Sequence, residues 1–213
     1  MSNPLQMRIT GLGGQGSILM AHIIGRAYSI EAGNQATMIQ SFGPEARGAA
    51  CSATLVLSED EVLYPYIRRP DVFVVMSGEG YEKYRDELKE DGTLVYEQDL
   101  VEARPKEGQE SFGIPSTRIA EELGKVIVQN IVMLGFATAV TGIVSLEEMR
   151  EAVEHSVPKG TEELNLKAFE RGVSWFEEEY NDGEKLPRGD GGKTEKTEES
   201  EQESSPESQE TAV

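Results

Sequence analysis

The feature that most constrains the fold of this chain is a run of glycines near its amino end, at residues 11–16. The run reads Gly-Leu-Gly-Gly-Gln-Gly, follows a short apolar segment at 7–10 and precedes an amphipathic segment from Ser17 to Ile30. This order predicts a strand, a tight turn and a helix. Four glycines in six positions allow a sharp turn and bring bare backbone to the surface. The first helical amides remain unpaired at the positive end of the helix dipole, which favours a phosphate or carboxylate there.

The same glycines satisfy G-x-G-x-x-G, the pattern of dinucleotide-binding turns. That pattern also requires an acidic residue about 20 positions further on, at the end of the second strand, to bind the ribose. Glu31 has this separation but ends the helix, and the expected second strand at 36–39 runs into the uncharged pair Gln40 and Ser41. Binding of NAD or FAD is therefore disfavoured. A turn whose glycines serve only helix–sheet packing remains an alternative.

A second loop-forming stretch follows at residues 40–50, where Gly43 and Gly48 interrupt the chain. Arg47 offers a planar guanidinium that suits a carboxylate or phosphate, and Glu45 is a candidate partner that would orient it. In a doubly wound sheet the loops after neighbouring strands gather at the carboxyl edge, where ligands bind. We therefore expect the two glycine-rich stretches to converge. The alternative is a surface loop with an ion pair worth under about 1 kcal/mol.

The remaining pattern predicts an α/β fold with a Rossmann-like wound, mostly parallel sheet, helices on both faces and further helices near the carboxyl end. Expected strands cover 51–57, 71–76, 93–96 and 112–115, and 61–63 is expected to pair with 51–57 across a turn. Expected helices cover 79–88, 126–140, 146–153 capped by Ser145, 164–180, and a segment capped by Ser116 or Thr117 that ends near Gly124. In the first helix, at 17–30, a stripe of Leu19, Ile23, Ala27 and Ile30 is expected to face the sheet.

Composition divides the chain into an α/β domain at 1–180 and an acidic tail at 181–213, which is expected to be disordered because it is too polar to bury a core. The formal net charge is −19, and ten acids against four bases at 182–213 supply −6 of it, leaving −13 for the rest. Such a surface disfavours nucleic acid as a partner. An acidic surface is typical of a solvent-exposed face, and is also compatible with a basic partner subunit or a cytoplasm of high salt concentration.

Several other classes are disfavoured by what the sequence contains. It has no apolar run of about 18 residues and no apparent secretory signal, so a cytoplasmic protein without a membrane span is expected. A single cysteine, Cys51, can form no internal disulfide and cannot supply the four thiolates of an iron–sulfur cluster. The two histidines are far apart, which disfavours structural zinc. His22 lies beside the expected apolar stripe, where a packed or half-exposed histidine is favoured over a catalytic one.

Taken together, several motifs carry a family resemblance. They are Gly11-Leu12-Gly13-Gly14-Gln15-Gly16, Ser41-Phe42-Gly43-Pro44-Glu45-Ala46-Arg47-Gly48, Pro70-Asp71, Pro115-Ser116-Thr117, Asn130 with Leu134-Gly135, and Asn165 with Ala168 and Gly172. With these motifs in order, residues 7–178 resemble the gamma subunit of 2-oxoacid:ferredoxin oxidoreductases. Phe42 to Arg47 and Tyr64-Pro65 resemble the 2-oxoglutarate branch most. Ala49 departs from that branch and is similar to the pyruvate branch, so pyruvate and branched-chain 2-oxoacids remain alternative substrates.

The resemblance implies a CoA-acylating enzyme complex that decarboxylates a 2-oxoacid on thiamine diphosphate. Electrons would pass through iron–sulfur clusters to ferredoxin, and the acyl group to coenzyme A. Thiamine diphosphate, magnesium and the clusters would be held by sister alpha and beta subunits, with a ferredoxin-like delta subunit as a further candidate partner. This chain would then be inactive alone, and no catalytic residue or metal ligand is assigned to it.

The hypothesis for the site is that both glycine-rich loops close over an active site shared with sister subunits. The candidates for facing substrate or coenzyme A are Gly11, Gly13, Gly14, Gln15, Gly16, Ser41, Gly43, Glu45, Arg47 and Gly48. One alternative is a stand-alone Rossmann-like nucleotide-binding oxidoreductase or regulator. Another is a purely structural subunit whose loops only pack against its neighbours.

Overall fold

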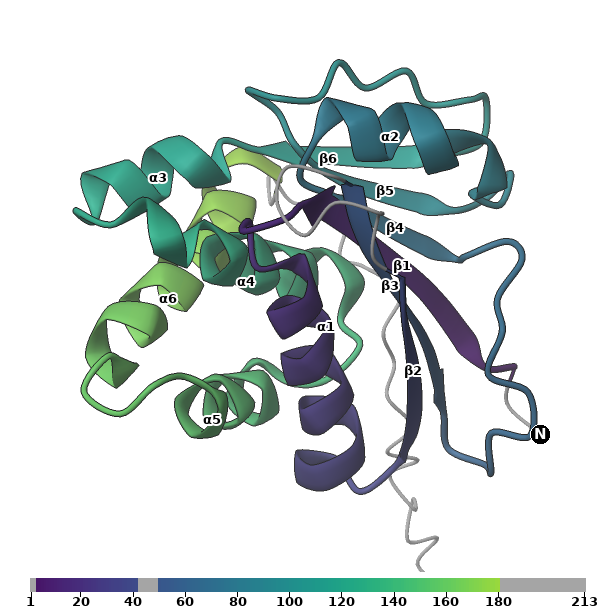
Figure 1. Cartoon of the computed structure of the whole chain (residues 1–213), viewed down its shortest axis with the longest axis horizontal. Coiled ribbons are helices and arrows are strands. Elements are labelled where there is room, and N and C mark those ends of the chain that lie inside the picture. Colours follow the sequence, from purple (N-terminus) through teal and green to yellow (C-terminus); the bar gives the residue numbers. More distant parts are fainter. Residues whose placement is uncertain (1–2, 42–49, 181–213) are drawn as a thin grey trace, which may run out of the picture.

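The computed structural model describes residues 3–41 and 50–180, which form a six-stranded sheet flanked by helices (Figure 1). The strand order is β2-β3-β1-β4-β5-β6. The strands are β1 (Leu5–Leu12), β2 (Gln35–Ser41), β3 (Ala50–Ser58), β4 (Val72–Val75), β5 (Thr93–Glu97) and β6 (Glu110–Ile114). β1 pairs in parallel with β4, β4 with β5, and β5 with β6, whereas β3 is antiparallel to both β1 and β2. The predicted α/β class with a mostly parallel sheet is confirmed.

Strand β3 lies between β1 and β2, so the strand that follows the first helix is not the neighbour of β1. Only residues 42–49 join β2 to β3, too few for a parallel crossover, which needs a dozen or more. The prediction that 61–63 pairs with this strand is wrong, because residues 61–67 form no strand. Both edges of β3 are already occupied by β1 and β2, which leaves no edge for a third partner.

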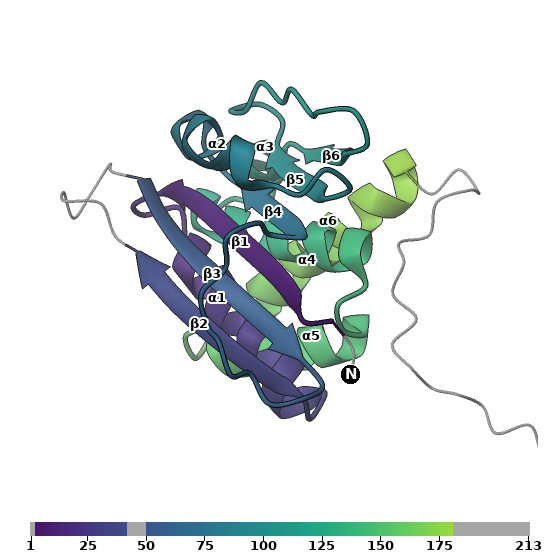
Figure 2. The same ribbon diagram turned by 90° about the vertical axis from the view of Figure 1, so that its right-hand side faces the viewer.

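Helices cover both faces of the sheet, as predicted (Figures 1 and 2). The helices are α1 (Ser17–Arg26), α2 (Gly78–Tyr84), α3 (Ser116–Glu122), α4 (Gln129–Thr141), α5 (Leu146–Ser156) and α6 (Glu162–Tyr180). Shorter turns are the π-helical η1 (Ala27–Glu31) and the 3₁₀ turns η2 (Arg85–Glu87) and η3 (Val126–Val128). Helix α2 lies on one face of the sheet, and α1, α4, α5 and α6 lie on the other.

The inward stripe of α1 differs from the predicted one. Met20 and Ile24 are fully buried in the main core, together with the predicted Ile23 and Ala27, whereas Leu19 and Ile30 are exposed. Ile30 lies in η1, where the wider π turn shifts side chains away from the 3.6-residue register on which the prediction depended.

Helices α4 and α6 pack so closely that each needs a glycine at the contact. A Cβ at Gly135 would lie 2.1 Å from the carbonyl oxygen of Phe169, and one at Gly172 would lie 2.0 Å from that of Val132. The end of α6 is also fixed to the edge strand β6, because the Tyr180 hydroxyl donates to the Gly113 carbonyl over 2.9 Å. This packing holds the start of α4 close to the carboxyl ends of the parallel strands.

Candidate functional site

The glycine turn, residues 11–16, lies at the carboxyl end of β1 and leads directly into α1. Gly14 has a φ of 101° and Gly16 a φ of 78°, values in the left-handed region that residues with a Cβ rarely adopt. The Gln15 amide donates to the Leu12 carbonyl over 3.1 Å and closes the turn. The predicted order of strand, glycine turn and helix is therefore confirmed.

The side chain of Gln15 supports this turn from within. Its Oε1 accepts from the Leu12 amide over 2.6 Å, and its Nε2 donates to the Met76 carbonyl over 3.0 Å, just beyond β4. A Cβ at Gly11 would come within 2.9 Å of the same Oε1. Gln15 thus joins the ends of two neighbouring parallel strands.

Asn130, on α4, supports the turn from the other side. Its Nδ2 donates to the Gly16 carbonyl over 3.3 Å, and a Cβ at Gly16 would come within 2.6 Å of that nitrogen. Gly16 is also the N-cap of α1, which has no side-chain cap and no acidic residue in its first turn. The first turn of α1 therefore supplies no carboxylate to neutralise the positive end of the helix dipole.

Polar groups of β1, β3 and the start of α1 form hydrogen bonds beside the glycine turn. The Cys51 thiol lies 3.1 Å from the Ser17 hydroxyl and 3.4 Å from the Gly11 carbonyl that accepts its hydrogen. The Thr10 hydroxyl donates to the Cys51 carbonyl over 3.0 Å. Cys51 is buried and engaged here. Its thiol therefore stabilises the base of the turn.

The second glycine-rich stretch is only partly described. Ser41, at the end of β2, is exposed and pairs with Ser52, while Ala50, at the start of β3, pairs with Leu12 at the end of β1. The candidates Gly43, Glu45, Arg47 and Gly48 lie outside the described residues. Both described ends of this stretch nevertheless lie at the same edge of the sheet as the glycine turn (Figure 2).

The geometry is unfavourable for a dinucleotide. Glu31, the one acidic residue at suitable spacing, pairs with Arg26 over 3.1 Å between Oε1 and Nε at the end of the first helical segment. β2, whose end would hold the ribose in a dinucleotide fold, is separated from β1 by β3. His22, predicted to be packed or half-exposed, is exposed on α1, where its Nε2 lies 2.9 Å from the Gln40 Nε2.

A buried carboxylate at the end of β5 was not among the predicted site residues. Glu97 is fully buried, and its Oε2 accepts from the Ser116 hydroxyl and, over 2.9 Å, from the Thr117 amide. The Thr117 hydroxyl donates to Gln129 Oε1 over 2.9 Å, which reaches the residue before Asn130. The prediction that Ser116 or Thr117 caps α3 is wrong: Pro115 is the N-cap, without a side-chain cap, and the carboxylate of Glu97 instead accepts from the Thr117 amide in the first turn of the helix. The Pro115-Ser116-Thr117 motif was the sequence signal for this network.

Neither a metal site nor a membrane span is present in the part of the chain that the structure describes. No group of three or more His, Cys, Asp or Glu side chains among these residues is arranged to hold a metal ion. No helix within 3–41 and 50–180 is long and apolar enough to cross a membrane.

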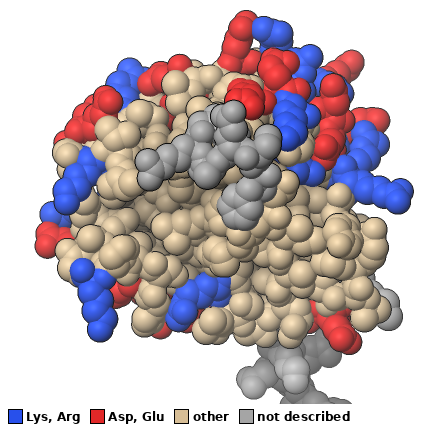
Figure 3. Space-filling model, viewed as in Figure 1, with Lys and Arg blue, Asp and Glu red and all other residues tan. Residues whose placement is uncertain are grey.

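Few charged side chains lie at the centre of the face that carries α1. Figure 3 shows acidic and basic residues gathered near the rims of this face, with a wide uncharged area at its centre. Three apolar side chains are exposed on α1, which follows the turn, or on η3, which precedes Asn130: Leu19 at 38%, Val126 at 43% and Ile127 at 71%. Leu19 is three residues after Gly16, and Ile127 is three before its contact Asn130.

Comparisons with known proteins show the family of this chain. A family model described as pyruvate ferredoxin/flavodoxin oxidoreductase matches residues 6–175. The chain is 45% identical over 170 residues to the 2-oxoglutarate synthase subunit KorC of Methanocaldococcus jannaschii, covering 78% of this chain and 91% of that protein. It is 37% identical to the solved keto/oxoacid ferredoxin oxidoreductase gamma subunit of Geobacter sulfurreducens, with a TM-score of 0.71 over 80% of this chain and 96% of the other.

A longer solved chain shares the fold at lower identity. It is the 2-oxoglutarate:ferredoxin oxidoreductase of Magnetococcus marinus, with 2-oxoglutarate, coenzyme A and succinyl-CoA bound. The TM-score is 0.74 at 24% identity, over 82% of this chain and 31% of that one. In that protein the matching fold is one part of a longer polypeptide.

Proposed function

The chain belongs to the pyruvate ferredoxin/flavodoxin oxidoreductase family, and on that premise we propose that it is the gamma subunit of a CoA-acylating 2-oxoacid:ferredoxin oxidoreductase. In this role its glycine turn contributes backbone amides to an active site that sister subunits complete in the cytoplasm. The observation that carries the proposal is the turn itself. Its amides begin α1 without a side-chain cap, and Gln15 and Asn130 fix its shape through hydrogen bonds.

The turn suits an anionic guest chemically. Unpaired amides at a helix start bind phosphate or carboxylate through hydrogen bonds and the dipole. A Cβ at Gly14 would meet no atom of residues 3–41 or 50–180 within 4 Å, so these residues leave space beside the turn. Both coenzyme A, through its phosphates, and a 2-oxoacid, through its carboxylate, have the required chemistry. Arg47 would add a guanidinium to the same guest, with Glu45 orienting it.

The redox cofactors do not fit the described residues of this chain. Cys51 is its only cysteine, and its buried thiol is engaged with Ser17 and Gly11. An iron–sulfur cluster normally requires four thiolates, and the described residues offer no group of metal-binding side chains. We therefore assign the clusters, thiamine diphosphate and magnesium to alpha and beta subunits, and electron transfer to ferredoxin or a ferredoxin-like delta subunit.

The partner subunits would contact the apolar residues beside the turn. Leu19, Val126 and Ile127 expose apolar side chains, and the face that carries α1 has few charged side chains at its centre (Figure 3). The cores of protein interfaces are depleted in charge and bury such side chains. Contact here would exclude water from the glycine turn, which strengthens its interaction with an anion.

The substrate we propose is 2-oxoglutarate. Support comes from the 45% identity to a relative that is named as a 2-oxoglutarate synthase subunit. Phe42 to Arg47 and Tyr64-Pro65 favour the same substrate, whereas Ala49 is similar to the pyruvate branch. The second carboxylate of 2-oxoglutarate would provide the additional negative charge that distinguishes it from pyruvate.

The test is co-expression with the alpha and beta subunits, followed by assay with 2-oxoglutarate, pyruvate and 2-oxoisovalerate in the presence of coenzyme A and a low-potential dye. The expected result is CoA-dependent dye reduction, fastest with 2-oxoglutarate, and an isolated chain that is colourless and inactive. Faster dye reduction with pyruvate than with 2-oxoglutarate would mean that pyruvate is the substrate. Saturable NAD binding by the isolated chain, without association with the other subunits, would overturn the proposed function.

A further inference from the structure

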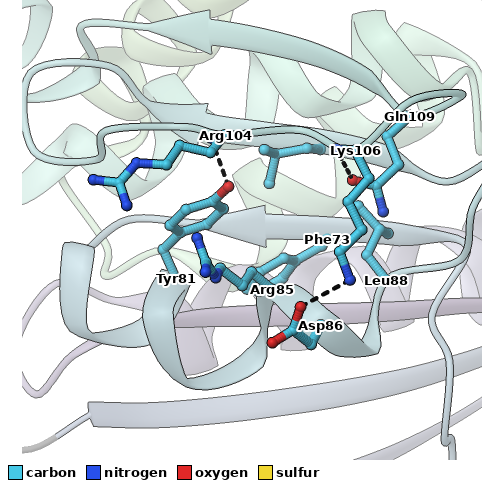
Figure 4. Close-up of a pocket in the computed structure, with 9 residues that line it drawn as sticks. Phe73, Tyr81, Arg85, Asp86, Leu88, Arg104, Lys106 and Gln109 are labelled. Atoms are coloured by element: carbon cyan, nitrogen blue, oxygen red, sulfur yellow. Dashed lines mark hydrogen bonds and ion pairs between the residues drawn. The ribbon is translucent and has the colours of Figure 1, made fainter.

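A cavity lies on the opposite face of the sheet from α1, between α2 and the segment that joins β5 to β6 (Figures 1 and 4). Its volume is about 200 Å³. Phe73 of β4, Leu94 of β5 and Leu88 form an apolar floor, and all three side chains are buried. Gln109 at its edge donates to the Lys89 carbonyl over 2.9 Å, near the amino end of β5. The cavity is thus well separated from the glycine turn.

The buried hydroxyl group of Tyr81 lines this cavity, and within residues 3–41 and 50–180 its hydrogen is not used as a donor. Tyr81 is 3% exposed, and its hydroxyl oxygen accepts from the Arg104 amide over 2.7 Å. The hydroxyl hydrogen has no acceptor among the residues that the structure describes. Buried polar groups normally find partners, so this hydrogen is available to a ligand that enters the cavity.

Three cations and one acid line the same cavity, in a chain that is otherwise strongly acidic. Arg85 approaches Glu82 at 3.5 Å through Nε, and its guanidinium donates no hydrogen bond within the described residues. Lys106 Nζ pairs with Asp86 over 2.8 Å, and Arg104 with Glu102 over 2.8 Å. Exposed pairs such as these are weak. A ligand carboxylate can therefore share or replace the partners of Arg85 and Lys106.

We propose that this cavity binds a small carboxylate that carries a single apolar ring or a short branched aliphatic group. The carboxylate accepts from the Tyr81 hydroxyl and pairs with Arg85 and Lys106, while the apolar group packs against Phe73 and Leu88. Cavities of about 150 Å³ admit benzene, whereas drug-sized ligands need about 300 Å³ or more. A volume of about 200 Å³ therefore suits one ring with its carboxylate.

The test uses the full chain in a ¹H–¹⁵N NMR titration with three probes: benzoate, benzamide and inorganic phosphate. Benzoate has both the ring and the charge, benzamide lacks the charge, and phosphate lacks the ring. The expected result is saturable shifts from benzoate at residues 81–88 and 104–109, with a Kd of about 1 mM for so small a ligand. Benzamide and phosphate are expected to bind about tenfold more weakly or not at all. Equal binding of benzoate and benzamide, or no saturable shift, would overturn the proposal.

Two variants and a control locate the binding. Arg85→Gln removes a surface charge with little risk to folding, and is expected to weaken benzoate binding about tenfold, in keeping with a lost charge-assisted hydrogen bond. Tyr81→Phe keeps the ring and removes the donor, with a similar expected loss. The control is Lys167→Gln, which breaks an exposed pair with Glu163 of 2.8 Å, the same distance as Lys106–Asp86. Wild-type affinity in Arg85→Gln, or an equal loss in Lys167→Gln, would disprove the assignment.

Discussion

Asn130 Nδ2 donates a hydrogen bond to the carbonyl of Gly16 over 3.3 Å, and so links residues 114 positions apart. The same carbonyl accepts from the Met20 amide in the first turn of α1 over 3.0 Å. On the other side, Gln129 accepts from Thr117, which also contacts the buried carboxylate of Glu97. A continuous set of contacts therefore joins the end of β5, the start of α4 and the glycine turn.

Replacing Asn130 by alanine tests whether this link positions the turn. We expect a loss of about 1 kcal/mol in the free energy of unfolding, the usual value for one hydrogen bond, and a larger relative loss of turnover in the assembled complex. Asn165→Ala is the control, because Asn165 Nδ2 donates to the Thr161 carbonyl over 2.9 Å at the start of α6. Urea unfolding of the subunit and dye reduction by the complex are measured together. Equal turnover losses in both variants would mean that Asn130 acts only on stability.

Arg47→Ala tests the role proposed for the second glycine-rich stretch. The guanidinium is expected to bind substrate or coenzyme A, so turnover should fall by about tenfold or more, while the urea midpoint stays within error. Arg118→Ala is the control, because Arg118 is an exposed arginine paired with Asp99 over 3.2 Å. It should leave turnover unchanged. Wild-type turnover in Arg47→Ala would favour a purely structural subunit.

Ile127→Glu tests the proposed subunit contact beside the glycine turn. A carboxylate buried in an interface loses its hydration without a partner, so co-purification with the alpha and beta subunits should weaken about tenfold or more. Ile30→Glu is the matched control, because Ile30 is 61% exposed but follows α1, away from the turn. Affinity capture and size-exclusion chromatography give the measurement. If Ile30→Glu prevents assembly and Ile127→Glu does not, the contact surface lies elsewhere.

Gly172→Ala tests the close packing of α4 and α6. The new methyl group would lie 2.0 Å from the carbonyl oxygen of Val132, so the helices must separate, at a cost of about 1–3 kcal/mol or more. Gly25→Ala on α1 is the control, since its methyl group would meet only Leu55 Cδ2 at 3.6 Å. Alanine there should be neutral or stabilise the helix by up to about 1 kcal/mol. Thermal unfolding compares the two variants, and equal midpoints would contradict the packing argument.

The amino-acid sequence predicted much of the fold and the family. The apolar runs at β4 and β5, the glycine turn and the Ser145 cap of α5 are local signals, and each lies where it was predicted; the cap includes the reciprocal bonds with Glu148. The family resemblance is confirmed by the match over residues 6–175. The proposed roles of Glu45 and Arg47, and the disorder expected at 181–213, remain predictions.

Tertiary structure decided what depends on partners distant in the sequence. The insertion of β3 between β1 and β2 left 61–63 without a strand to pair with, and the contact of Asn130 with Gly16 required α4 to pack beneath the sheet. The hydroxyl of Ser116 donates to the Glu97 carboxylate and does not cap the start of α3. Hydrophobic periodicity and turn propensity act over a few residues, so the sequence by itself determined the elements and the glycine turn. Pairing, register and the burial of polar groups depend on which surfaces meet, and only the assembled fold decides that.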